Sequence, residues 1–80
     1  MGIREAVADR ILAFCNERNI SLHALARYSA IPPSTLKNII YGVSANPGIV
    51  TIKMLCDGLD ISIVEFFDTE IFRTLEQEIE

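Results

Sequence analysis

The sequence predicts an all-α domain of five short helices with a short C-terminal helical tail. Apolar residues recur three or four positions apart in several separate stretches, which is the spacing of one helix face. Proline, glycine and helix-capping residues stand between these stretches, and no stretch alternates apolar and polar residues as a strand does. The chain of 80 residues has the size of one domain, and it is 50% apolar, so a compact core can form.

The first helix is predicted over residues 4–18, where one apolar stripe recurs at helical spacing: Val7, Ile11, Phe14 and Cys15. Asn19 suits the left-handed position that follows a helix. Ser21 can then serve as the N-cap of a short second helix over residues 22–28. The inner side of this second helix carries Leu22, Leu25 and Ala26.

Two consecutive prolines separate the second helix from the third. A residue that precedes proline is pushed out of the α region, so Ile31 and Pro32 should be extended. The fixed φ of Pro33 suits the first position of a helix. The third helix is therefore expected from Pro33 to about Tyr41, with Pro32 as its N-cap and Gly42 after its end.

The outward side of the third helix is polar and carries no acid, with Ser34, Lys37 and Asn38 on it. An ordinary solvent-exposed side more often mixes Glu with Lys. The opposite side is apolar and carries Leu36, Ile39 and Ile40. Because a helix of this length is not stable alone, we expect other helices to hold it with its polar side available.

The second half of the chain continues the helical pattern. After a polar loop over residues 43–48, a fourth helix is expected from about Ile49 to Gly58. Ser62 and Glu65 form a capping box, which predicts that a fifth helix starts at Ile63.

The last segment keeps helical spacing in its apolar residues, which are Ile71, Phe72, Leu75 and Ile79. Asp68 or Thr69 can cap it. The segment could fold back on the same domain or form a seam with a second copy, and its spacing alone does not separate these two interpretations.

The formal net charge of −4 is unevenly distributed along the chain. Residues 1–56 carry a net charge of +3, whereas residues 57–80 carry a net charge of −7. The acidic end is either a solvated surface or the rear of a domain whose front faces a polyanion. The charges alone favour neither interpretation.

Several protein classes are disfavoured by what the sequence lacks. It has no apolar run long enough for a membrane span and no apolar segment of a signal peptide near its start. Cys15 and Cys56 match no metal-ligand spacing, so we interpret them as core thiols in a reducing, cytoplasmic setting. A single histidine, His23, and no glycine-rich phosphate loop argue against an enzyme, a metal site or a bound cofactor.

Two helices of these lengths around a tight turn form the helix-turn-helix pattern. Residues 20–42, I-S-L-H-A-L-A-R-Y-S-A-I-P-P-S-T-L-K-N-I-I-Y-G, resemble the Xre family of lambda-repressor and Cro-like DNA-binding domains. The resemblance continues as that family's fourth and fifth helices through residues 46–67, N-P-G-I-V-T-I-K-M-L-C-D-G-L-D-I-S-I-V-E-F-F. It implies a helix-turn-helix domain over residues 1–67 and a separate tail over residues 68–80.

The resemblance also implies which residues contact DNA. The family's third helix lies in the major groove, which places Pro33, Ser34 and Asn38 against base edges, with Lys37 close by. Asn can bond bidentately to adenine, Ser can donate or accept, and proline offers only apolar contact. Phosphate contacts are implied at the start of the second helix and in the loop after the third, at Ser21, Ser44 and Asn46.

This sequence departs from the family pattern at three places. Leu22 stands where the family often has a phosphate-binding Gln. Ala30 stands in the turn where the family usually has Gly, which predicts roughly 1 kcal/mol of backbone strain. The loop over residues 43–48 has no Lys or Arg, so we expect weak, salt-sensitive DNA binding by one copy.

Three further side chains have two interpretations each. Arg10 and Arg18 are either solvated helix charges or phosphate ligands. Tyr41 either packs against the following loop or touches DNA.

The sequence as a whole predicts a sequence-specific transcriptional regulator, phage-repressor-like, that binds double-stranded DNA as a homodimer. The dimer seam is the preferred role of the tail, because helix-turn-helix domains commonly read paired half-sites. The alternative is a protein-interaction module on the same fold, antitoxin-like or antirepressor-like, with little DNA binding. Leu22 and the acidic residues 57–80 motivate this alternative. A third interpretation is the DNA-binding part of a longer regulator.

Overall fold

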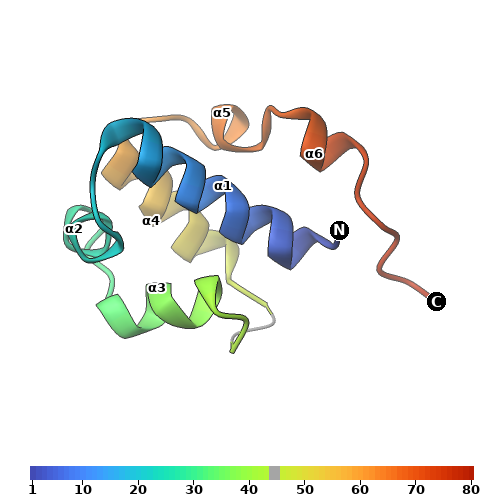
Figure 1. The fold of residues 1–80 in the computed structure, drawn as a ribbon, viewed down its shortest axis with the longest axis horizontal. Coiled ribbons are helices and arrows are strands. Elements are labelled where there is room, and N and C mark those ends of the chain that lie inside the picture. Colours follow the sequence, from blue (N-terminus) through green and yellow to red (C-terminus); the bar gives the residue numbers. More distant parts are fainter. Residues whose placement is uncertain (44–45) are drawn as a thin grey trace.

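The computed structural model describes residues 1–43 and 46–80, and within these ranges it contains six helices and no strand (Figure 1). The helices are α1 (Ile3–Arg18), α2 (Leu22–Tyr28), α3 (Pro33–Ile40), α4 (Ile49–Leu59), α5 (Ile63–Phe67) and α6 (Glu70–Arg73). The all-α fold class is confirmed, and the predicted bounds of the first four helices and the start of the fifth agree with these to within one residue.

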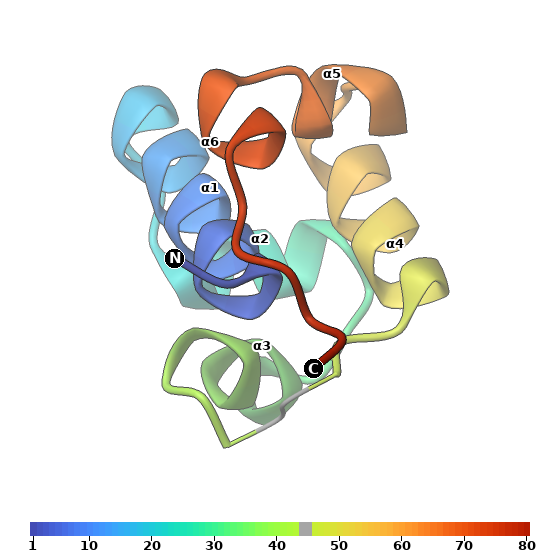
Figure 2. The same ribbon diagram turned by 90° about the vertical axis from the view of Figure 1, so that its right-hand side faces the viewer.

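The helices are arranged so that α3 is supported from one side only. α2 lies at one end of the molecule and contacts α1, α3 and α4. α5 packs against α4 and α6 against α1, and both lie on the side away from α3 (Figures 1 and 2). The opposite side of α3, at the lower edge of both views, is left open.

The core is built from apolar side chains of the first five helices. The largest of those that are almost completely buried are Val7, Ile11, Leu25, Leu36, Ile39, Leu55, Cys56, Leu59 and Phe66. The ring of Phe66 lies 4.9 Å from that of Phe67, 6.1 Å from that of Phe14 and 6.3 Å from that of Phe72, measured between centroids. Aromatic pairs at such spacings add stabilisation beyond area burial, so α5 and α6 are anchored to α1 through these rings.

Three helices end with the same local structure, in which a residue of left-handed backbone conformation is followed by an isoleucine. The left-handed residues are Asn19, Ala30 and Asp60, with φ of 55°, 57° and 57°. The N–H of each following isoleucine donates to the carbonyl five residues before it, at 3.0 Å in all three cases. This is the Schellman arrangement, which satisfies helix-end carbonyls. The predicted left-handed backbone conformations of Asn19 and Ala30 are both confirmed.

Each of these helix ends leads directly into the N-cap of the next helix. The caps are Ser21, Pro32 and Ser62, all with extended backbone, as predicted. The hydroxyl oxygens of Ser21 and Ser62 each accept a backbone N–H three residues later, at 3.0 Å. One residue ends a helix, the next packs inward and the third starts another helix, which explains how such short helices follow one another closely.

Arg10 and Arg18 have a role that neither sequence interpretation anticipated. Arg10 donates through Nε to the carbonyl of Phe66 (2.7 Å) and through Nη2 to the carbonyl of Glu65 (2.9 Å). Arg18 donates to the carbonyl of Leu59. Both guanidinium groups therefore satisfy carbonyls at the C-terminal ends of α5 and α4, where a cation also interacts favourably with the helix dipole.

The C-terminal tail is less helical than its apolar spacing suggests. α6 is a single turn, and residues 74–80 are not helical. Acidic side chains are unfavourable at the C-terminal end of a helix, and this stretch carries Glu76, Glu78 and Glu80. The tail instead runs back along the molecule, where the N-terminal ammonium group pairs with the carboxylate of Glu76 at 3.1 Å (Figure 2).

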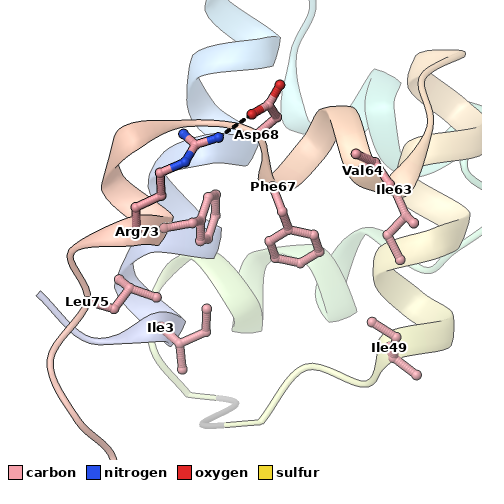
Figure 3. Close-up of a pocket in the computed structure, with 9 residues that line it drawn as sticks. Ile3, Ile49, Ile63, Val64, Phe67, Asp68, Arg73 and Leu75 are labelled. Carbon is pink, nitrogen blue, oxygen red and sulfur yellow. Dashed lines mark hydrogen bonds and ion pairs between the residues drawn. The ribbon is translucent and has the colours of Figure 1, made fainter.

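A shallow groove of about 650 Å³ opens beside the tail, between α5 and α6 and the first turns of α1 and α4 (Figure 3). Asp68 and Arg73 form an ion pair at its rim. Its remaining lining is apolar and consists of Ile3, Ile49, Ile63, Val64, Phe67, Phe72 and Leu75.

Candidate nucleic-acid interface

α3 presents the predicted polar side to solvent. Ser34, Lys37 and Asn38 are exposed, whereas Leu36 and Ile39 are buried. Pro33, at the first helical position, is half-buried. The structure therefore brings the predicted base-contacting residues together on one short helix, with Pro33 at its start and Asn38 one turn beyond Ser34.

The first turn of α3 is tighter than the sequence indicates. The N–H of Thr35 donates to the carbonyl of Pro32 at 3.0 Å. Proline has no N–H, so Ser34 carries the first backbone N–H of the helix. The start of α3 therefore offers few unpaired backbone donors, and its side chains carry most of the hydrogen-bonding capacity of this surface.

The turn that positions α3 is held from behind by α4. Ser29 is 4% exposed, and a Cβ added at Gly58 of α4 would lie 3.0 Å from the backbone N of Ser29. Sequence reasoning placed Gly58 at the end of the fourth helix and missed this contact, because glycine inside a helix gives no sign of which distant backbone it approaches.

The predicted phosphate-contacting residues lie on two different elements. Ser21 is exposed at the start of α2, and Asn46 is exposed in the loop that follows α3. Ser44 lies outside the residues that the structure describes. Leu22, which stands where the family often has a phosphate-binding Gln, is half-buried and packs against the core.

Arg4 is a cation at this surface that sequence reasoning missed. A Cβ added at Gly42, which follows α3 and has φ +79°, would lie 3.1 Å from Nη1 of Arg4. Arg4 belongs to the first turn of α1, far from α3 in the sequence, so no local pattern could have placed it there. Tyr41, beside Gly42, is 72% exposed.

The charged side chains of α2, α3 and the loop after α3 are all positive. The sequence has no acidic residue between Glu17 and Asp57, so α2, α3 and the loop after α3 contain none. Arg27 and Lys37 are exposed there. α5 and α6, which each carry an acid, lie on the side away from α3, and the acidic tail ends at the end of the molecule opposite α2 (Figure 1). The side of the molecule that carries α2 and α3 can therefore face a polyanion.

The sequence model of the Cro/C1-type HTH DNA-binding domain matches residues 10–70. The chain belongs to the Cro/C1-type helix-turn-helix family. This match covers the helix-turn-helix of α2 and α3 together with its supporting helices, and it confirms the resemblance to the Xre, lambda-repressor and Cro-like domains. α3 is the second helix of the motif in this Cro/C1-type domain.

The fold is also that of a protein from a prophage. The crystal structure of the prophage Lp1 protein 11 superimposes with a TM-score of 0.81 and 26% sequence identity, covering 94% of this chain and 100% of that chain. No protein of curated function matches this Cro/C1-type domain in sequence. Among its described helices, none is long and apolar enough to cross a membrane.

Proposed function

We propose that this chain is a sequence-specific transcriptional regulator of the phage-repressor kind, which acts in the cytoplasm and reads the major groove of duplex DNA with α3. The observation that carries the proposal is the exposed, acid-free outward side of α3, held from behind by α1 and α2. Ser34 and Asn38 discriminate bases by hydrogen bonding, Lys37 lies beside them, and Pro33 offers apolar contact to a thymine methyl group.

Ser21, Asn46 and Ser44 hold phosphates in this proposal. Ser21 precedes the helix-turn-helix and Asn46 follows it, so contacts from both would flank α3. The hydroxyl oxygen of Ser21 accepts the N–H of Ala24, which leaves its proton to donate to a phosphate oxygen. Contacts of this kind fix the register of the protein on DNA and carry no sequence information themselves.

The regulator acts as a homodimer in this proposal, with the second copy against the groove beside the tail. Ile49 and Val64 at the groove are 63% and 73% exposed. Exposed apolar side chains gathered in one place are typical of association surfaces. A two-fold axis at the groove that runs towards the outward side of α3 would leave both α3 helices on the same side of the dimer, facing one duplex.

The decisive experiment is selection from a randomised duplex pool by the purified protein at low salt, followed by sequencing of the retained fraction. A palindromic site should be enriched, with its half-sites about one helical turn apart. Repeating the selection with added salt separates base reading from uniform attraction to phosphates, which falls steeply as the salt concentration rises.

Absence of enrichment would contradict base reading and favour the alternative of a protein-interaction module. The apolar groove is the feature that supports this alternative, because it would then receive a different protein. The two functions therefore predict different results of the selection: a DNA-binding regulator enriches a palindromic site, whereas a protein-interaction module enriches no duplex.

A further inference from the structure

The guanidinium group of Arg4 lies against the backbone at the C-terminal end of α3. A Cβ added at Gly42 would lie 3.1 Å from Nη1, 3.4 Å from Cζ and 3.5 Å from Nη2 of Arg4. The whole planar group is therefore packed against the residue that ends the motif. The first turn of α1 therefore brings a positive charge to the C-terminal end of α3, next to the loop that follows α3.

Arg4 differs from the other arginines of α1. Arg10 and Arg18 donate to carbonyls at the ends of α5 and α4. Within residues 1–43 and 46–80, Arg4 has neither an ion pair nor a side-chain hydrogen bond, and the cations paired there are the N-terminus, Lys53 and Arg73. None of the five donors of this guanidinium group is therefore committed to another group of the described residues.

The surroundings of Arg4 favour an anion. Arg4, Asn46 and Pro47 line one part of a small cavity of about 210 Å³ whose other lining residues are apolar, which places Arg4 beside the loop that contains the predicted phosphate-binding Asn46. That loop carries no acid, and it also carries no Lys or Arg of its own. A guanidinium group held by α1 supplies the positive charge that the loop lacks.

We propose that Arg4 binds a backbone phosphate of the duplex that α3 enters, next to the end of α3. This inference rests on the proposed function, because it takes duplex DNA as the ligand. The planar fork of a guanidinium group matches two phosphate oxygens. Contact with a phosphate strengthens binding to every sequence by a similar factor and leaves the choice of bases to α3.

The test replaces Arg4 with methionine, which keeps an unbranched apolar stem and removes the charge. Dissociation constants are measured over a series of salt concentrations, for the selected site and for an unrelated duplex. Arg4→Met should weaken binding to both duplexes by a similar factor. The slope of log affinity against log salt should become shallower by about 0.9 per copy of the protein. Arg4→Lys should keep most of the slope.

A second variant controls for the loss of one positive charge at a distance. Lys53→Met removes a cation that is already paired with Asp57 on α4 and that lines neither the groove nor the cavity beside Arg4, and its salt slope should equal that of the wild type. A lowered melting temperature of Arg4→Met with an unchanged slope would mean that Arg4 only stabilises the end of α3, and it would overturn the proposal. If the wild type binds no duplex at any salt concentration, the proposed function fails as well, so the two failures are distinguishable.

Discussion

Gly58 of α4 and Ser29 of the helix-turn-helix turn lie so close that only glycine leaves room between them. A Cβ at position 58 would lie 3.0 Å from the backbone N and 3.1 Å from Cα of Ser29. These atoms belong to the backbone, which cannot move aside as the end of a flexible side chain can. The turn that orients α3 is therefore seated directly on α4.

Gly58→Ala should destabilise the domain by about 1–2 kcal/mol, because overpacking against a fixed backbone is costly. Alanine in a helix would by itself be favourable by about 1 kcal/mol, so a net loss would show that the close approach dominates. Urea denaturation measures the free energy of unfolding. Gly2→Ala is the control, because a Cβ there meets nothing within 4 Å, and a net gain in Gly58→Ala would contradict the contact.

Ala30→Gly should stabilise the domain by up to about 1 kcal/mol. Ala30 has φ 57°, where an ordinary side chain is strained and glycine is not. Thermal denaturation gives the shift in melting temperature. Asn19→Gly tests the same local structure with a residue that tolerates the left-handed conformation, so its gain should be smaller. Equal gains at both positions would mean that the strain at Ala30 is absent.

Asn38→Ala should cost about 1–3 kcal/mol of binding free energy at the selected DNA site and relax the preference at one base pair. The amide of Asn38 is exposed on the outward side of α3, and its loss leaves one base edge unread. Selection from the randomised pool with the variant measures the preference at every position. An unchanged preferred sequence would remove Asn38 from base reading.

Arg10→Met should destabilise the domain by about 1–3 kcal/mol, because two carbonyls at the end of α5 lose a charged donor. Chemical denaturation measures this loss. The salt dependence of DNA binding should remain that of the wild type, since the guanidinium group of Arg10 is already hydrogen-bonded to carbonyls of α5. A shallower salt slope would instead assign Arg10 to a phosphate and contradict its role as a structural cap.

If the proposed homodimer forms through the groove beside the tail, Val64→Glu should weaken it at least tenfold, because the variant places a charge in that apolar groove. Sedimentation equilibrium measures the dissociation constant of the dimer. Leu12→Glu is the matched control, since Leu12 is an exposed apolar residue that does not line the groove. If both variants dimerise like the wild type, the seam lies elsewhere.

Features that depend on neighbouring residues could be predicted from the sequence. Pro32 and Pro33 determine where α3 starts, Ser62 determines where α5 starts, and Asn19 marks the end of α1. Each of these signals is a backbone preference of the residue itself or of the one beside it. The polar side of α3 followed in the same way, because helical spacing assigns residues to sides once the bounds are known.

Contacts between distant parts of the chain could not be predicted. No local pattern relates the residues that meet in three such contacts, which are Gly58 with Ser29, Arg4 with Gly42, and Arg10 with the end of α5. The tail shows a different limit, because its apolar spacing is helical but α6 ends after one turn. Packing of Phe72 against Phe67 and the acids that follow determine its course.

The two buried cysteines allow local opening of the core to be measured. Cys15 of α1 is 6% exposed and Cys56 of α4 is fully buried, and burial raises the pKa of both thiols. Since the thiolate is the reactive form, neither cysteine reacts readily while the helices stay packed. The rate at which a thiol reagent labels each cysteine therefore measures how often α1 or α4 separates from the core, and equal rates would mean that both helices open as one unit.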